Sequence, residues 1–247
     1  MIDEEMLLIK RLTELSERAC TRGIRQYSDF LNLSGQDVLL KLKLRSKVTL
    51  MGGFDTAERK IACFEPYDCE YEELPPIAYI IIEPLAQKFA DPLAHRDFLG
   101  SLLALGIRRE VLGDIIIHEN CGYLICSDTI SEYIIQNLVK VKHTDVRCKS
   151  VDSLPETSLK LPEISNVITA SERIDGIVAA VFNISRGDAQ DLISHKKVFI
   201  CGKLIESLTV APKLGDIISV RGFGRFIYEG IERETKKGRL LLKIRKF

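Results

Sequence analysis

Residues 169–193 read TASERIDGIVAAVFNISRGDAQDLI, and the fold of the C-terminal part of the chain follows from this segment. Thr169 to Glu172 and Ser185 to Asp188 both have the spacing of a capping box, in which a hydroxyl side chain is followed three residues later by a carboxylate. Apolar residues follow each box at helical spacing: Ile174, Val178 and Val181 after the first, and Ala189, Leu192 and Ile193 after the second. The pattern predicts two short helices that follow each other closely.

An arginine lies at the start of each predicted helix, Arg173 before the first and Arg186 in the second. A guanidinium group pairs with phosphate through two parallel hydrogen bonds, and helix N-termini direct N–H groups outward. This placement indicates contact with a phosphate backbone.

The charge of the chain is divided unevenly. Residues 167–247 hold 15 Lys/Arg and 9 Asp/Glu, a formal charge of +6, and the remaining residues hold 20 and 26, a formal charge of −6. A basic C-terminal part indicates a polyanionic partner, and phosphate contacts supply affinity more than sequence choice. We expect the residues that contact this polyanion to be Arg173, Ser185, Arg186, Lys196, Lys197, Lys203, Lys213, Arg221 and Arg225. For any single lysine, an ordinary solvated charge is the alternative.

Short β segments are expected after the two helices, at 198–200, 217–220, 225–233 and 239–245, with a hairpin turn at 235–238. Residues 166–247 therefore form a predicted C-terminal domain. Residues 153–165 contain Pro155 and Pro162 and are expected to be a linker.

Residues 75–152 fit the order β-α-β-β-α-β, which is the split βαβ, or ferredoxin-like, arrangement. Strands are expected at 77–82, 115–117, 123–125 and 143–151, and helices at 95–105 and 131–139. RNA-binding sheets often have this architecture, but the aromatic-rich signature of their central strands is absent here. The fold alone therefore does not establish RNA binding for this domain.

Residues 1–74 are expected to form a small N-terminal region with helices at 3–20 and 36–44 and strands at 47–50 and 60–64. Leu74-Pro75-Pro76 marks its boundary. The predicted fold class of the whole chain is α+β.

A second RNA or partner surface is expected from basic residues of these first two regions. Gly52-Gly53 to Lys60 lacks the phosphate-loop patterns, and a strained turn that displays Arg59 and Lys60 is the simplest account. The predicted helix 95–105 adds charged residues at its two ends. The expected surface comprises Arg59, Lys60, His95, Arg96, Arg108 and Arg109.

The seven cysteines, at 20, 63, 69, 121, 126, 148 and 201, are an odd number without a C-x-x-C pair. Cys63 and Cys69 are six apart, and Cys121 and Cys126 are five apart, so we expect buried reduced thiols and no metal site. No cofactor is expected. The chain starts with acidic residues, so we do not expect a signal peptide. It has no run of about 18 apolar residues, so we do not expect a membrane helix.

Catalysis is not expected. His95-Arg96-Asp97 occurs without a Gly-rich nucleotide loop or D-F-G, so a helix surface is a better interpretation of this segment than a kinase catalytic loop. No Rossmann glycine fingerprint is present.

Residues 169–222 resemble the S-four RNA-binding domain, named after ribosomal small-subunit protein four. Four blocks carry the resemblance: Ser171–Asp175, Ser185–Ala189 with Leu192-Ile193, Val198–Lys203, and Lys213–Val220. Ile174 replaces the usual leucine of the first block. Cys201 replaces the usual asparagine of the third, and this removes an amide from a turn.

Upstream blocks extend the resemblance to nearly the whole chain. Tyr27–Leu31, Gly52–Lys60, and His95–Glu110 followed by Gly113–Ile115 resemble the YlmH-like proteins, which include cyanobacterial and plastid photosystem II S-four domain proteins. The resemblance implies RNA binding, a link to cell division or photosystem II biogenesis, and, for some members, binding of stalled peptidyl-tRNA complexes on the large ribosomal subunit in translation quality control.

The first hypothesis is a noncatalytic RNA-binding factor whose partners are rRNA and tRNA on the large ribosomal subunit. A protein-interaction scaffold for division or photosystem assembly is the alternative, with a protein partner for the acidic N-terminal part. An RNA-modifying enzyme is a third hypothesis. The cytoplasm and the plastid stroma are both open as compartments.

Overall fold

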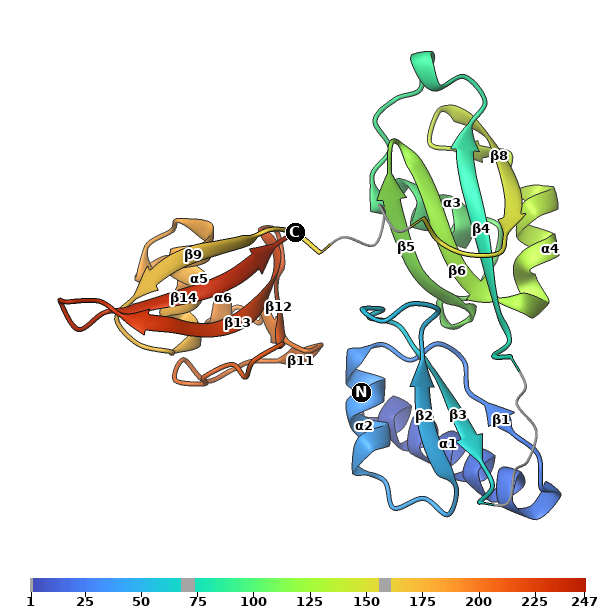
Figure 1. Ribbon diagram of the computed structural model, residues 1–247, viewed down its shortest axis with the longest axis horizontal. Helices are drawn as coiled ribbons and strands as arrows, with labels where there is room; N and C mark the ends of the chain where they lie inside the picture. The colour runs from blue at the N-terminus through green and yellow to red at the C-terminus, as the bar shows by residue number, and fades with distance from the viewer. Residues whose placement is uncertain (1, 68–73, 156–160) are drawn as a thin grey trace. The chain divides into compact units, whose positions relative to one another are not determined.

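The computed structural model describes residues 2–67, 74–155 and 161–247, and of Ile2, Asp3 and Phe89 only the backbone. The chain divides into two compact units, residues 1–160 and 161–247 (Figure 1). Helices and antiparallel sheets occur in both units, which confirms the predicted α+β class.

The first unit begins with two helices and a three-stranded sheet in the order β1-β3-β2. The elements are α1 (Ile2–Arg22), β1 (Gln26–Tyr27), α2 (Leu33–Lys41), β2 (Lys47–Met51) and β3 (Ile61–Glu65). Leu12 and Ala19 of α1 are fully buried in one cluster with Ala62 and Phe64 of β3, so the apolar stripe of α1 covers the sheet.

Helix α2 lies three residues earlier than the predicted helix 36–44. The side chain of Asn32 accepts a hydrogen bond of 2.8 Å from the Gly35 N–H and so caps the start. Leu42 is already extended, which ends the helix although the apolar spacing continues.

The second sheet of this unit has the strand order β5-β6-β4-β8-β7. Its elements are β4 (Ile77–Pro84), η1 (Gln87–Phe89), α3 (His95–Ala104), η2 (Arg109–Val111), β5 (Leu112–His118), β6 (Cys121–Ser127), α4 (Asp128–Asn137), β7 (Lys140–Val141) and β8 (Thr144–Val151). Each β-α-β unit has its two strands separated by a strand of the other unit, as the predicted split arrangement requires. Phe98 and Leu102 of α3 and Ile134 of α4 are fully buried against this sheet.

The hairpin between β5 and β6 turns through Glu119 and Asn120, whose φ angles are 50° and 62°. Two successive residues with positive φ form a type I′ turn, whose twist matches that of the flanking strands. His118 and Cys121 are consequently paired across the turn, and this fixes the register of the two strands.

The two sheets of the first unit share a core. Phe30 and Ile61, from the N-terminal part, are buried in one cluster with Ile125 and Leu154. The hydroxyl of Tyr79 on β4 donates to the carbonyl of Gly53 at 2.8 Å. The predicted boundary at residue 74 between an N-terminal region and a ferredoxin-like domain stays a proposal, because this apolar cluster contains residues from both sides of it.

The second unit is a six-stranded sheet in the order β11-β10-β12-β13-β14-β9 with two helices. The elements are β9 (Ile164–Thr169), α5 (Ile174–Phe182), α6 (Arg186–Ser194), β10 (Val198–Ile200), β11 (Lys203–Leu204), β12 (Ile217–Val220), β13 (Gly224–Glu234) and β14 (Leu240–Lys246). Ile177 and Val178 of α5 and Ile193 of α6 pack on Phe226 and Leu242 of the sheet.

Strand β9 begins at Ile164, inside the stretch 153–165 that was expected to be a linker. It pairs with β14 from Ile164 opposite Arg245 to Thr169 opposite Leu240. The segment therefore contributes an edge strand to the sheet.

The capping box predicted at Thr169 to Glu172 is wrong. Thr169 is still part of β9, so the chain cannot turn into a helix there, and α5 begins at Ile174 with Arg173 at the N-cap position. Glu172 instead accepts a hydrogen bond from the hydroxyl of Tyr228. The second predicted box is confirmed: Ser185 Oγ accepts from the Asp188 N–H, and the Asp188 carboxylate accepts from the Ser185 N–H.

We predict that alanine has opposite effects on stability at two glycines, one in the five-stranded sheet and one in helix α3, which packs on it. A Cβ at Gly122 in β6 would lie 2.6 Å from the ring of Phe98, whereas one at Gly100 in α3 would meet nothing within 4 Å. Gly122→Ala should destabilise by about 1–3 kcal/mol through overpacking. Gly100→Ala should stabilise by up to about 1 kcal/mol through helix propensity.

Scanning calorimetry of the full chain would measure both changes. An unchanged melting temperature for Gly122→Ala would contradict the close packing of α3 on β6.

Candidate nucleic-acid interface

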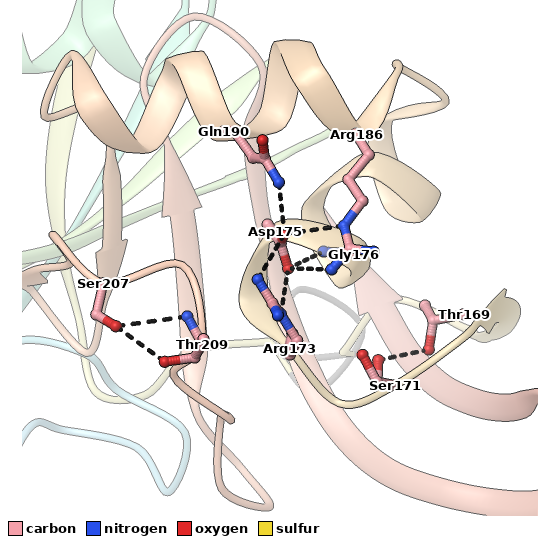
Figure 2. Close-up of polar contacts among 9 residues, drawn as sticks. All are labelled: Thr169, Ser171, Arg173, Asp175, Gly176, Arg186, Gln190, Ser207 and Thr209. Carbon is pink, nitrogen blue, oxygen red and sulfur yellow. Dashed lines mark hydrogen bonds and ion pairs between the residues drawn. The ribbon is translucent and has the colours of Figure 1, made fainter.

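Two of the predicted RNA-binding residues converge on one buried carboxylate. Asp175, the second residue of α5, is 0% exposed. Arg186 Nε donates to its Oδ2 at 2.9 Å, and Arg173 Nε and Nη2 donate to its two oxygens at 3.3 Å each. Figure 2 shows both guanidinium groups directed at Asp175, together with the amide of Gln190.

The remaining hydrogen-bonding capacity of the carboxylate is also used. Gln190 Nε2 donates to Oδ2 at 3.0 Å, and the Gly176 N–H donates to Oδ1 at 2.9 Å. We call Asp175, Arg173, Arg186, Gln190 and Gly176 the Asp175 cluster. A buried charge is tolerated when it is both paired and hydrogen-bonded in this way.

The cluster alters the acidity of its members. Burial by itself raises the pKa of Asp175, but hydrogen bonds from Arg186, Gln190 and Arg173 outweigh it, and the pKa falls from 3.8 to about 2. The hydrogen bond to Asp175 in turn raises the pKa of Arg186 above its usual value. The cluster is therefore ionised at neutral pH, with two positive charges against one negative charge.

The outer parts of both arginines remain accessible, with side-chain exposures of 38% for Arg173 and 49% for Arg186. Asp175 accepts a hydrogen bond from Nε of each guanidinium, and this restricts both side chains. The cluster thus fixes two adjacent cations at the surface of the second unit.

The helix N-termini contribute less to this site than the sequence indicated. The Ile174 N–H donates to the carbonyl of Val210 at 2.8 Å, and the Gly176 N–H is used by Asp175. In α6 the Asp188 N–H donates to Ser185 Oγ, so Ser185 acts as a cap. At this site the arginine side chains, rather than the helix N–H groups, remain accessible.

A second group of predicted residues follows the other end of α6. Lys196 and Lys197 come after the last helical residue, Ser194, and a helix of nine residues separates them from Arg186 by about 13 Å. The Arg221 N–H donates to the carbonyl of Lys197 at 2.9 Å, which joins the loop after α6 to the loop after β12. We call Lys196, Lys197, Arg221 and Arg225 the basic edge; all four are exposed.

Aromatic rings hold the two arginines of the basic edge. The Arg221 guanidinium lies 4.8 Å from the ring centre of Phe199, and that of Arg225 lies 4.4 Å from Phe247. Stacking of this kind restricts the side chain and keeps its charge. Lys196 differs, because its ammonium forms an ion pair of 3.4 Å with Glu206.

The last two predicted residues of this unit, Lys203 and Lys213, are exposed on loops or short strands. Lys203 follows the turn Cys201-Gly202, whose φ angles are 47° and 76°. Asparagine is favoured over most residues in that conformation, and Cys201 adopts it here with its thiol donating to Asp216 at 3.3 Å. The backbone shape of the turn is therefore kept without the amide.

The structure contradicts the exposed turn that was expected to display Arg59. The Arg59 side chain points into the junction of the first unit, where it donates to three backbone carbonyls: those of Leu112 at 2.8 Å, Phe30 at 3.0 Å and Arg109 at 3.0 Å. Burial lowers the pKa of Arg59 to about 10, and the neighbouring Arg109 adds to this effect. The physical reason for its place is that a planar guanidinium with several N–H groups can donate to carbonyls of three different segments at once.

Arg109 is used in the same way, because its Nη1 donates to the carbonyls of Leu112 and Gly113. Lys60 is half-buried, and its N–H donates to the carbonyl of Leu31. The remaining three residues are exposed at opposite ends of α3, with His95 and Arg96 opening the helix and Arg108 following it. The six residues therefore do not form one surface.

Three structural residues were not identified from the sequence. Asp175 and Gln190 complete the cluster, and Asp114 accepts from the Glu58 N–H at 2.7 Å and so holds the loop that carries Arg59. The sequence could have indicated both aspartates. Each lies between apolar residues that are buried in the structure, and a charge in such a segment requires a partner.

Within residues 2–67, 74–155 and 161–247, no three His, Cys, Asp or Glu side chains are grouped as metal ligands. No helix in these ranges has the length and apolar character needed to cross a membrane. The cysteines described there are free, and Cys69 lies outside them.

We predict that Asp175 makes stability depend on pH in a defined window. Because its pKa is lower in the folded than in the unfolded state, its ionisation stabilises fully above about pH 4, and this stabilisation is lost as the pH falls toward 2. The difference in free energy of unfolding between the parent chain and Asp175→Asn should therefore shrink from pH 5 to pH 2.

Urea unfolding at several pH values measures this difference. Asp191→Asn, an exposed change on the neighbouring helix α6, controls for the loss of one surface carboxylate. A difference for Asp175→Asn that stays constant over the window would contradict the account.

We also predict a structural role for Arg59. Lysine at this position keeps the charge but cannot reach three carbonyls with a planar fork, so Arg59→Lys should cost about 2–3 kcal/mol of stability. Arg108→Lys, an exposed change nearby, is the matched control and should cost less than about 0.5 kcal/mol. Equal urea midpoints for the two variants would argue against the buried role.

Comparison with known proteins adds an independent finding. A family model described as "Putative RNA-binding domain in YlmH" matches residues 77–154, which include β4 to β8. A relative from Bacillus subtilis (strain 168), named Ribosome-associated protein quality control protein P2, is 30% identical over 219 residues. That match covers 85% of this chain and 82% of the relative.

The fold is also similar to a solved structure, that of Cell division protein ylmH from Streptococcus pneumoniae. The TM-score is 0.51 at 17% sequence identity, and the match covers 63% of this chain and 94% of the other. At this identity the likeness concerns the fold. The relative from Bacillus subtilis, aligned over most of both sequences, decides the family, and the chain belongs to the YlmH-like proteins.

Proposed function

We propose that this protein is a noncatalytic RNA-binding factor that acts on the ribosome. It would bind rRNA and tRNA on the large subunit in translation quality control, within the cytoplasm. The observation that carries the proposal is the Bacillus subtilis relative, whose name is Ribosome-associated protein quality control protein P2. The family model over residues 77–154 supports RNA binding by a second route.

The second unit supplies the physical means. Its excess of positive charge attracts a phosphate backbone, and Asp175 holds Arg173 and Arg186 at the surface before any ligand arrives. Lys196 and Lys197 follow the other end of α6, about 13 Å from Arg186, a distance that suits contacts with separate phosphates of one backbone rather than with a single small anion. We propose the S-four RNA-binding domain as the identity of this unit.

The five-stranded sheet of the first unit and its helices would add a second contact with RNA. Two modules on one chain gain affinity because the second contact forms at a high effective concentration. Of the predicted residues outside the second unit, His95, Arg96 and Arg108 are exposed and stay candidates for this contact.

A protein-interaction scaffold is the second candidate. The first 166 residues carry a formal charge of −6, which suits a basic protein partner, and the Streptococcus pneumoniae protein is named for cell division. Recovery of a partner that survives RNase treatment would favour this interpretation. A link to photosystem II biogenesis stays an expectation of the family resemblance.

We predict that Lys197→Glu with Arg221→Glu reduces RNA binding at least tenfold and weakens its dependence on salt. Each lost phosphate contact should lower the slope of log K against log salt by about 0.7–0.9. In cells, UV crosslinks of the parent chain should concentrate on large-subunit rRNA and tRNA and should decrease in this variant.

Arg186 is unsuitable for such a test, because a glutamate there would face the buried carboxylate of Asp175. The matched control is Lys10→Glu with Lys43→Glu, which changes the charge by the same amount at exposed positions of the first unit. Crosslinks that do not depend on Lys197 and Arg221, or that do not occur at all, would refute the proposed mechanism.

A further inference from the structure

The loop between β12 and β13 places an aromatic ring at the surface. It reads Arg221-Gly222-Phe223-Gly224-Arg225, and the side chain of Phe223 is 45% exposed. Gly222 and Gly224 have φ angles of 87° and 124°, which residues with a side chain rarely adopt. The two glycines thus set the backbone that presents Phe223.

The ring of Phe223 is anchored to the core of the second unit by other rings. It meets Phe182 edge to face, with 5.7 Å between the ring centres, and Phe182 meets Phe226 in the same manner at 5.9 Å. Phe226 is fully buried, whereas Phe223 is the outermost of the three. This chain of contacts fixes the orientation of an apolar surface that water still reaches.

Cations surround this ring chain. The Lys246 ammonium lies 4.7 Å from the centre of the Phe182 ring. At the two ends of the loop, Arg221 stacks on Phe199 and Arg225 stacks on Phe247. No Asp or Glu occurs in the sequence between Asp216 and Glu229. The loop also adjoins Lys197 through the hydrogen bond from the Arg221 N–H.

We propose that Phe223 is a stacking platform for one unpaired nucleobase of the bound RNA, with Arg221 and Arg225 placed for the neighbouring phosphates. The inference rests on the proposed function and specifies which kind of RNA structure the basic edge binds. A base in a continuous duplex has both faces covered by its neighbours, so an exposed ring stacks on bases that are unpaired or turned outward. The surrounding positive charge favours RNA over an apolar protein segment.

The test compares an oligouridylate of about 12 nucleotides with an RNA duplex of similar length. Phe223→Ala should weaken binding of the single strand roughly 5- to 150-fold and leave binding of the duplex unchanged. Phe223→Tyr should restore single-strand binding, because it keeps an aromatic face. Equal losses for both RNAs, or no loss, would overturn the proposal.

A second measurement detects stacking directly. The chain contains no tryptophan, so Phe223→Trp introduces a single tryptophan, whose fluorescence can be excited separately from that of the seven tyrosines. The oligouridylate should quench this fluorescence, and the duplex should not. Tyr133→Trp, at a side chain of 44% exposure on α4, is the control and should respond to neither.

The outcomes separate this inference from the proposed function. A parent chain that binds neither RNA and gives no crosslinks to large-subunit rRNA or tRNA in cells would refute the proposed function itself. If the chain binds RNA through Lys197 and Arg221, but the single strand leaves the fluorescence of the Phe223→Trp variant unchanged, only the stacking platform would be refuted.

Discussion

The second unit depends on a carboxylate that is ionised although water does not reach it. Asp175 stands in the first turn of α5, where the helix dipole favours negative charge, and its oxygens accept from both arginines, Gln190 and a backbone N–H. Removal of one partner from a buried ion pair commonly costs about 3–5 kcal/mol, because the other charge is left unpaired. Arg186 and Gln190 are four residues apart on α6, so one face of that helix must lie against the start of α5. The packing of the two helices and the position of the surface cations therefore have the same cause.

The first unit uses arginine for a different purpose. Arg59 and Arg109 donate to carbonyls of η2 and of the start of β5, and Asp114 accepts from the N–H groups of the loop that carries Arg59. In each unit a charged side chain satisfies groups that apolar residues would leave without a partner. The consequence differs, because the arginines of the Asp175 cluster keep an accessible side, whereas Arg59 is directed inward. Charge in a sequence is thus weak evidence of a binding surface until burial is known.

Charge and aromatic rings are combined at the basic edge. Phe199 and Phe247 support Arg221 and Arg225, and Phe182 lies under Lys246, so three cations are restrained by rings. Two of these rings belong to segments far from the loop in sequence, one in α5 and one at the end of the chain. In the proposed function, phosphate attraction at this surface would give affinity, whereas stacking on Phe223 would select for unpaired RNA.

Local sequence patterns were sufficient to predict most elements and the distribution of charge. The apolar periodicities predicted α1, α3 and most strands of the two larger sheets, although not β7, β9 or β11. The Ser185 box predicted the start of α6, and the count of charges placed the basic surface in residues 167–247. These features depend on residues close together in the chain, where spacing and backbone preference govern the outcome. The start of α5 depends instead on long-range pairing, since β14 keeps Thr169 in a strand. The inward direction of Arg59 and the sharing of Asp175 by Arg173 and Arg186 likewise could not be predicted, because both arrangements join residues through contacts that only folding creates.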